Sequence, residues 1–221
     1  MDYFKNRQAA GQLLAEKLME FKSQSPLVLG IPRGGIPVAF EVAKKLQAPL
    51  DLLAVKKIGS PTNLELAIGA VSEDGKPWLN KQIIHYLRIG AEELQRIVKL
   101  KTDEVKKQSL RLRGSSQGID VEGKTLIIVD DGIATGATLS AAIALLRSRK
   151  AKQIIVATPV APESTLQLIA KVADRVVCLH APEYFNAVGD WYDDFTQVSD
   201  DEVIEMLRSK KHLPPLKESD L

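Results

Sequence analysis

The segment at residues 126–138, LIIVDDGIATGAT, constrains the fold of this chain more than any other. An apolar run ends in two adjacent carboxylates, Asp130 and Asp131, and a short turn rich in Gly and Thr leads into a helix-forming segment at residues 139–149. Because short apolar, β-branched runs are typical of buried strands, this order predicts a strand, a turn and a helix. The turn then lies at the carboxyl end of its strand, where open α/β sheets bind ligands.

The turn has the chemistry of a phosphate-binding site. A helix N-terminus presents unpaired N–H groups and the positive end of the helix dipole to an anion. Gly136 allows the backbone to approach a ligand, and Thr135 and Thr138 add hydroxyl donors. A phosphate site beside two carboxylates suits a sugar phosphate, whose hydroxyls bind the acids. The alternative is an ordinary turn that ends a buried strand.

Apolar runs elsewhere predict further strands that alternate with helices. Strands are expected at residues 27–31, 51–55, 67–71, 125–130, 153–159 and 175–180, and helices at 4–21, 36–46, 81–113, 139–149 and 163–172. This alternation indicates an α/β fold, with a parallel twisted sheet that helices cover on both faces. The charged, helical segment at 72–120 interrupts it as an insertion, and the length of 221 residues suits a single domain over 1–221.

A second Gly-rich turn follows the first predicted strand, in the sequence GIPRGGIPVA at residues 30–39. Gly34 and Gly35 suit a tight turn with exposed N–H groups, and Arg33 supplies a permanent charge with forked donors for phosphate. Taken alone, this motif is equally consistent with a plain turn. Lys56 and Lys57 follow the second predicted strand, where they either bind an anion or are simply solvated.

In order and spacing, these motifs resemble those of the type I phosphoribosyltransferases. The blocks shared with a group of bacterial phosphoribosyltransferase-like proteins are PRGG, N-x-E-x-A-x-G-A-V and D-D-G-x-A-T-G-A-T. The resemblance implies the fold of that family, with a small hood and a C-terminal helix at residues 180–210. It also implies binding of 5-phosphoribosyl 1-pyrophosphate (PRPP). Family members often contain a non-proline cis peptide in the first Gly-rich loop, which would lie next to Arg33 here.

The resemblance assigns roles within a PRPP site. It implies that Asp130 and Asp131 hold the ribose hydroxyls, while the next loop wraps the 5-phosphate through Ala134, Thr135, Gly136, Ala137 and Thr138. The implied pyrophosphate site consists of Arg33, Gly34 and Gly35 with Lys57, the first choice, and Lys56, the second. Mg²⁺ is the implied cofactor, and we expect it to bind through PRPP and water rather than through protein side chains alone.

The implied reaction transfers the phosphoribosyl group of PRPP to a nitrogen of a small nucleobase-like heterocycle and releases pyrophosphate. The implied catalytic residues are the two aspartates, Arg33, Lys57 and Glu65. Glu65, just before the predicted strand at 67–71, is either a base or a structural hydrogen-bond acceptor. Ala134 stands where the 6-oxopurine enzymes carry Asp, so the motif is more similar to the adenine and orotate enzymes and lacks the usual general base.

Two regions around the site have more than one interpretation. Residues 76–113 carry ten basic and four acidic side chains, and the basic helical segment at 76–118 occupies the place of the family's mobile flap. Its length favours a fixed cover with a dimer contact over a lid. In the hood, Tyr184, Phe185, Trp191 and Tyr192 either stack on a base or form a hydrophobic cluster under a loop.

Composition narrows the function classes. An enzyme is favoured because Arg33 and Lys57 would clamp a leaving group; the alternatives are a non-catalytic PRPP-binding regulator and a hydrolase. The net charge of +2 gives no support for a nucleic-acid partner. No apolar run reaches the roughly 18 residues of a membrane span and no signal peptide is evident, so a cytoplasmic protein is expected. A homodimer is expected as well. The single cysteine, Cys178, cannot form an internal disulfide.

Overall fold

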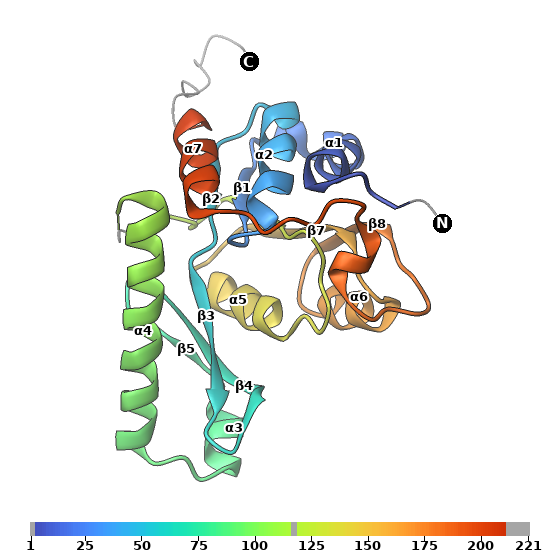
Figure 1. Cartoon of the computed structure of the whole chain (residues 1–221). Helices are drawn as coiled ribbons and strands as arrows, with labels where there is room; N and C mark the ends of the chain where they lie inside the picture. Colours follow the sequence, from blue (N-terminus) through green and yellow to red (C-terminus); the bar gives the residue numbers. More distant parts are fainter. Residues whose placement is uncertain (1–2, 116–118, 211–221) are drawn as a thin grey trace.

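A computed structural model describes residues 3–115 and 119–210 of the chain, and its centre is a parallel five-stranded sheet (Figure 1). The strand order is β2-β1-β6-β7-β8, and every neighbouring pair is parallel. The strands are β1 (Leu27–Gly30), β2 (Leu50–Leu52), β6 (Thr125–Val129), β7 (Gln153–Val160) and β8 (Arg175–His180). The predicted α/β class with a parallel sheet between helices is confirmed.

Helices cover both faces of this sheet. On one face lie α1 (Arg7–Lys17), α2 (Gly35–Leu46) and α7 (Asp200–Lys210), and on the other α5 (Ala137–Ser148) and α6 (Glu163–Ala170) (Figure 1). Successive side chains of a strand point to opposite faces. Accordingly, Ile127 of β6 joins the core under α1 and α2, whereas Leu126 and Ile128 join the core under α5 and α6.

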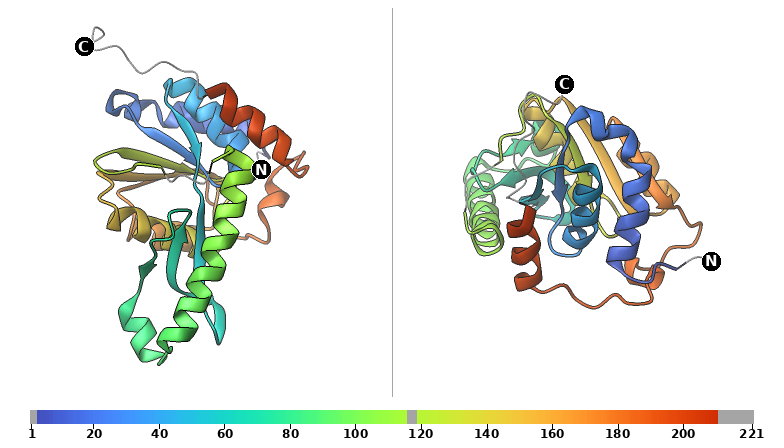
Figure 2. Two further views of the ribbon diagram at one scale, coloured as in Figure 1. Left: turned by 90° about the vertical axis from the view of Figure 1, so that its left-hand side faces the viewer. Right: turned by 90° about the horizontal axis from the view of Figure 1, so that it is seen from above.

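A second, antiparallel sheet projects from this body together with two helices (Figures 1 and 2). It consists of β3 (Val55–Ser60), β4 (Asn63–Ser72) and β5 (Trp78–Leu79), followed by α3 (Lys81–Tyr86) and α4 (Ala91–Arg113). Ile58 and Ile68 of the sheet are buried against α4 side chains such as Ile97. This packing makes the sheet and α4 one unit.

The projection corrects two expectations from the sequence. The strand expected at 67–71 belongs to the antiparallel β4 and lies outside the parallel sheet, because a short apolar run does not reveal the direction of its partner. The helix expected at 81–113 is two helices, because Gly90 caps the start of α4 in an extended conformation. The departure from the main sheet therefore begins at Val55 rather than at residue 72.

Arg113, the last residue of α4, fixes this helix to the main sheet. Its Nε lies 2.8 Å from Oδ1 of Asp51 in β2, and its NH1 lies 2.6 Å from Oε1 of Glu73. Burial alone would lower the pKa of Arg113, but these two carboxylates raise it above its ordinary value. The paired charge holds the C-terminal end of α4 beside the carboxyl end of β1 and β2.

The N-terminal segment and the region after β8 lie side by side. The backbone N–H of Phe4 donates to the carbonyl of Trp191 at 2.9 Å, and Trp191 and Tyr192 are buried against Phe4. Short 3-10 turns complete the chain at η1 (Met19–Gln24) and η2 (Val188–Trp191). Across the described ranges, no helix combines the length and the apolar character needed to cross a membrane.

Candidate active site

The loops that follow β1 and β6 touch at the carboxyl edge of the main sheet. A Cβ on Gly34 would lie 2.0 Å from Oδ2 of Asp131, and a Cβ on Gly35 would lie 2.7 Å from the carbonyl oxygen of Val129. Neither position has room for a side chain. The sequence predicted these glycines as turn residues; the structure shows that they also let two motifs about a hundred residues apart come into contact.

The loop after Asp131 is an open cradle at the start of α5. Gly136 has a φ of 68°, in the left-handed region, and α5 begins at Ala137. On the side of the loop that faces the protein, the hydroxyl of Thr165 in α6 donates to the carbonyl of Ala134 at 2.6 Å. The side chains of Thr135 and Thr138 are at least partly exposed. The loop is thus held from the protein side, and its outer face is free to bind an anion.

Asp130 and Asp131 form a partly buried pair of carboxyl groups. The backbone N–H of Asp131 donates to Oδ1 of Asp130 at 3.0 Å. Burial, followed by the negative charge of Asp131, raises the pKa of Asp130 well above its ordinary value. A site with a developing positive charge would relieve this repulsion, and a sugar hydroxyl would satisfy the carboxyl oxygens.

Two contacts that support Asp131, from Arg7 and Tyr192, were not predicted from the sequence. The Nε of Arg7 in α1 donates to Oδ2 of Asp131 at 2.7 Å, while its guanidinium lies 3.8 Å from the centroid of the Phe195 ring. The hydroxyl of Tyr192 donates to the backbone carbonyl of Asp131 at 2.5 Å. Burial, and next the charge of Asp131, raises the pKa of Tyr192, so the phenol remains a neutral donor.

The same contacts decide between the two interpretations of the hood aromatics. Trp191 and Tyr192 are each only 7% exposed and pack in a hydrophobic cluster with Phe4. For these two rings the structure supports the hydrophobic-cluster alternative. Tyr184, in contrast, is 83% exposed.

Basic side chains surround a cavity of about 490 Å³ next to the first Gly-rich loop. Its lining comes from that loop, β3, α4 and α7: Pro32, Arg33, Lys56, Lys107, Gln108, Arg111, Leu112 and Asp200. The peptide bond between Pro32 and Arg33 is cis, at the position expected for this loop. The cavity brings four cations to one place, which suits a polyanion.

The structure places the two lysines on different faces of β3, and their roles stay predictions. Lys56 lines the cavity, whereas Lys57 is the next residue of the extended strand β3 and projects from its opposite face. The sequence could not decide between them because the face depends on where the strand begins.

Glu65 lies within β4, close to the turn of the β3–β4 hairpin. Its backbone is near Asn63, which pairs with Ser60 at the far end of the hairpin from Ser72 and Val55. The side chain of Glu65 is outside the described part of the structure. Its role, as a base or as a structural hydrogen-bond acceptor, stays a prediction.

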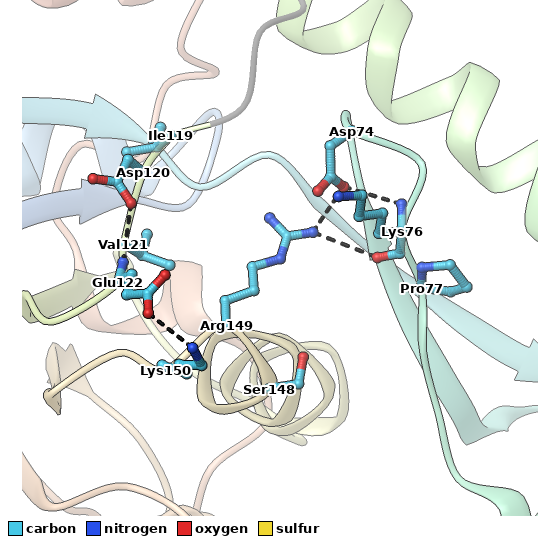
Figure 3. Close-up of a pocket in the computed structure, with 10 residues that line it drawn as sticks. All are labelled: Asp74, Lys76, Pro77, Ile119, Asp120, Val121, Glu122, Ser148, Arg149 and Lys150. Carbon is cyan, nitrogen blue, oxygen red and sulfur yellow. Dashed lines mark hydrogen bonds and ion pairs between the residues drawn. The ribbon is translucent and has the colours of Figure 1, made fainter.

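A separate cavity of about 400 Å³ lies at the other edge of the sheet (Figure 3). Its residues precede β6, follow β4 or end α5, and the five residues of β6 separate this edge from Asp130 by roughly 17 Å. Arg149 extends across the cavity to Oδ1 of Asp74 at 2.8 Å (Figure 3). Lys150 binds Glu122 at 3.0 Å. These pairs join α5 to the projecting sheet and to the loop before β6, and we assign them a structural role.

Comparison with known proteins identifies the family. A family model described as "Phosphoribosyl transferase domain" matches residues 2–196, and the chain belongs to this family. Two Mycobacterium tuberculosis relatives, MT0597 (strain CDC 1551 / Oshkosh) and Rv0571c (strain ATCC 25618 / H37Rv), bear provisional names as phosphoribosyl transferases and are each 44% identical over 207 residues. The match covers 94% of this chain but 47% of each relative, so the chain spans about half their length.

Solved structures show the same fold. TT1426 from Thermus thermophilus has a TM-score of 0.87 and 37% sequence identity, with 94% of this chain and 99% of that chain covered. The AQ2163 protein from Aquifex aeolicus, with 14% identity and a TM-score of 0.50, covers 83% of this chain and 78% of its own. The family resemblance deduced from the motifs is confirmed.

Proposed function

We propose that the chain transfers the 5-phosphoribosyl group of PRPP to a nitrogen of a small heterocyclic acceptor and releases pyrophosphate. The observation that carries this proposal is the contact between the two loops, where Gly34 lies against the carboxylate of Asp131. Because of this contact, one ligand can reach the phosphate cradle, the two aspartates and the cationic cavity together. PRPP has a phosphate, ribose hydroxyls and a pyrophosphate in that order.

In this arrangement each part of the site has one task. Asp130 and Asp131 bind the ribose hydroxyls, and the backbone N–H groups at the start of α5 bind the 5-phosphate. As pyrophosphate leaves, C1 of the ribose becomes positively charged and reduces the repulsion between the two carboxylates. An interaction that is stronger in the transition state than in the ground state accelerates the reaction. Arg33 and Lys56 stabilise the charge of the leaving group.

The side chains present suit a Mg²⁺ ion that binds mainly through the substrate. Within residues 3–115 and 119–210, no group of three or more His, Cys, Asp or Glu side chains forms a metal site. Mg²⁺ usually keeps several waters and binds substrate phosphates. In this proposal it would bind the pyrophosphate of PRPP and offset its negative charge.

A single position limits the range of possible acceptors. The side chain of Ala134 has no group that could accept a proton from the acceptor or donate to it, unlike the Asp of the 6-oxopurine enzymes. We therefore propose a nucleobase-like heterocycle other than hypoxanthine or guanine. Its specificity would come from the hood, where Tyr184 is exposed.

We also propose that the projecting unit is a fixed cover rather than a flap. The burial of Ile58 and Ile68 against α4 and the ion pairs of Arg113 support this proposal.

The exposed apolar side chains of Tyr86 and Leu100, 83% and 57% accessible, support the expected dimer contact on the same unit. Sedimentation equilibrium of the wild type and of Leu100→Glu would test it: the wild type should be a dimer and the variant a monomer.

Pyrophosphate release from PRPP and Mg²⁺, measured with pooled nucleobases and with none, tests the reaction. Release that requires the pool supports the transferase, and dividing the pool then identifies the acceptor. Equal release without bases indicates a hydrolase. Stabilisation of the fold by PRPP with no release under either condition indicates the non-catalytic regulator.

A further inference from the structure

Asp200, the first residue of α7, lies among the cations of the proposed pyrophosphate site. Its Oδ1 is 3.5 Å from NH1 of Arg33, and its Oδ2 forms an ion pair with Nε of Arg111 in α4. The carboxylate side chain is 14% exposed, whereas the two arginine side chains are 41% and 72% exposed. A shielded anion is thus bound by two cations that solvent can reach.

The same carboxylate lines two cavities. The cavity of about 490 Å³ that holds Lys56 and Lys107 and a neighbouring cavity of about 520 Å³ share Arg33, Arg111 and Asp200 as common walls. If the carboxylate moved from between the arginines, the lining that the two cavities share would be more cationic and could accept a doubly phosphorylated group.

We propose that Lys107 and Arg111 of α4 belong to the pyrophosphate site, and that Asp200 is an internal carboxylate that competes with pyrophosphate for Arg33 and Arg111. This inference rests on the proposed function. A guanidinium offers the same forked donors to a carboxylate and to a phosphate. Pyrophosphate carries more negative charge than one carboxylate, so it displaces Asp200 when it binds. When the product leaves, Asp200 again neutralises the arginines, which favours release.

The fold places both partners for this exchange. Lys107 and Arg111 are four residues apart in α4 and therefore lie on one face of that helix. The carboxyl-terminal turn of α4 is held by the ion pairs of Arg113 with Asp51 and Glu73. Arg111 can therefore release Asp200 without losing the attachment of its helix.

The start of α7 is also held independently of Asp200. The hydroxyl of Ser199 accepts from the backbone N–H of Glu202 at 3.2 Å, and Glu202 Oε2 accepts from the backbone N–H of Ser199 at 2.7 Å. This capping box stabilises the helix end, and Val203 and Leu207 anchor α7 in the core. Replacement of Asp200 by Asn should therefore leave the helix folded.

Calorimetric titration with inorganic pyrophosphate and, separately, with ribose 5-phosphate tests the inference on the whole chain. Asp200→Asn should bind pyrophosphate about fivefold or more tightly, and Lys107→Gln and Arg111→Gln about fivefold or more weakly. Affinity for ribose 5-phosphate should not change in any of them. Lys106→Gln and Glu205→Gln are matched controls, because each removes an exposed charge of the same helix that lines neither cavity.

The outcomes separate this inference from the function on which it rests. If the wild type binds PRPP and pyrophosphate but the three variants match it, the inference is wrong and the proposed function stands. The inference also fails if Asp200→Asn binds pyrophosphate more weakly, since Asp200 would then assist binding. If the wild type binds neither PRPP nor pyrophosphate, both proposals fail. Thermal unfolding of each variant verifies that it is folded.

Discussion

The two halves of the candidate site are built in different ways. In the proposed ribose half, Asp131 is 14% exposed and is held by Arg7, itself 11% exposed, and by the hydroxyl of Tyr192. In the proposed pyrophosphate half, Arg33 and Arg111 are 41% and 72% exposed, and both share one carboxylate. One half is fixed before a ligand arrives, and the other consists of long side chains that can exchange partners.

This difference follows from what each half must do in the proposed reaction. The ribose stays bound during transfer, so fixed acceptors can be preorganised around its hydroxyls without later movement. The pyrophosphate arrives as part of PRPP and leaves as a free anion. Side chains with solvent-exposed charges can bind it and release it, since their attraction to it is moderated by water. The loop after β6 is thus the rigid one, and the loop after β1 is the one whose charged side chain can exchange partners.

The largest expected effect on turnover comes from removing a charge in the adaptable half. Arg33→Ala should lower turnover by about a hundredfold or more, because one donor to the developing charge of the leaving group is lost. Its melting temperature should change little, since Arg33 is 41% exposed. Steady-state kinetics and thermal unfolding would be measured together, with the exposed Arg208→Ala as a control. A large drop in melting temperature with normal turnover would make Arg33 a structural residue.

Gly34→Ala should break the contact between the halves. The added Cβ would lie 2.0 Å from Oδ2 of Asp131, so the carboxylate must turn away from Arg7 and from the ribose position. The loss of one hydrogen bond to a charged group lowers PRPP affinity by roughly tenfold or more. Calorimetry would measure it, and Gly90→Ala is the matched control because nothing lies within 4 Å of a Cβ there. Equal affinities for the two variants would contradict the close packing of the loops.

Asp130→Asn should raise the stability of the folded protein while weakening its binding of the ribose. The pKa of Asp130 in the folded protein is raised above the ordinary 3.8, so the folded state favours the protonated group and the ionised group lowers stability. Asn removes this cost at neutral pH, and each 1 kcal/mol of relief raises the melting temperature by roughly 2–4 °C. The advantage shrinks as the pH falls through the raised pKa towards 3.8. Below both pKa values it disappears, because wild-type Asp130 is then neutral.

Melting curves of Asp130→Asn and the wild type between pH 3.5 and 8 would measure this, with the exposed Asp193→Asn as a control. Ribose 5-phosphate should bind the Asn variant more weakly, because an anionic acceptor is lost. A lower melting temperature of Asp130→Asn at pH 7 would show that the carboxylate makes a favourable native contact that outweighs its repulsion from Asp131.

The sequence predicted the parts of the site that are local and missed those made by distant contacts. Thirteen consecutive residues define β6, the cradle and the start of α5, so their roles can be read together. Arg7 lies 124 residues from Asp131 and Tyr192 lies 61 residues from it, and no local pattern connects them. Similarly, the apolar run at 67–71 identified a strand but could not reveal the antiparallel partner that takes it out of the main sheet.

Tyr192→Phe should have the smallest effect of these changes. The ring still fills its place against Phe4, and only the hydrogen bond to the carbonyl of Asp131 is lost, at a cost of about 1 kcal/mol of unfolding free energy or less. Because the pKa of Tyr192 is raised above its ordinary value of 10, the alkaline limb of the wild-type rate profile should not report its ionisation. Rate–pH profiles and chemical unfolding of Tyr192→Phe and of the exposed Tyr184→Phe would test this. If Tyr192→Phe alone loses as much turnover as Arg33→Ala, the hydroxyl positions Asp131 for catalysis. The fixed half would then depend on this one hydrogen bond far more than is expected of a bond between two neutral groups.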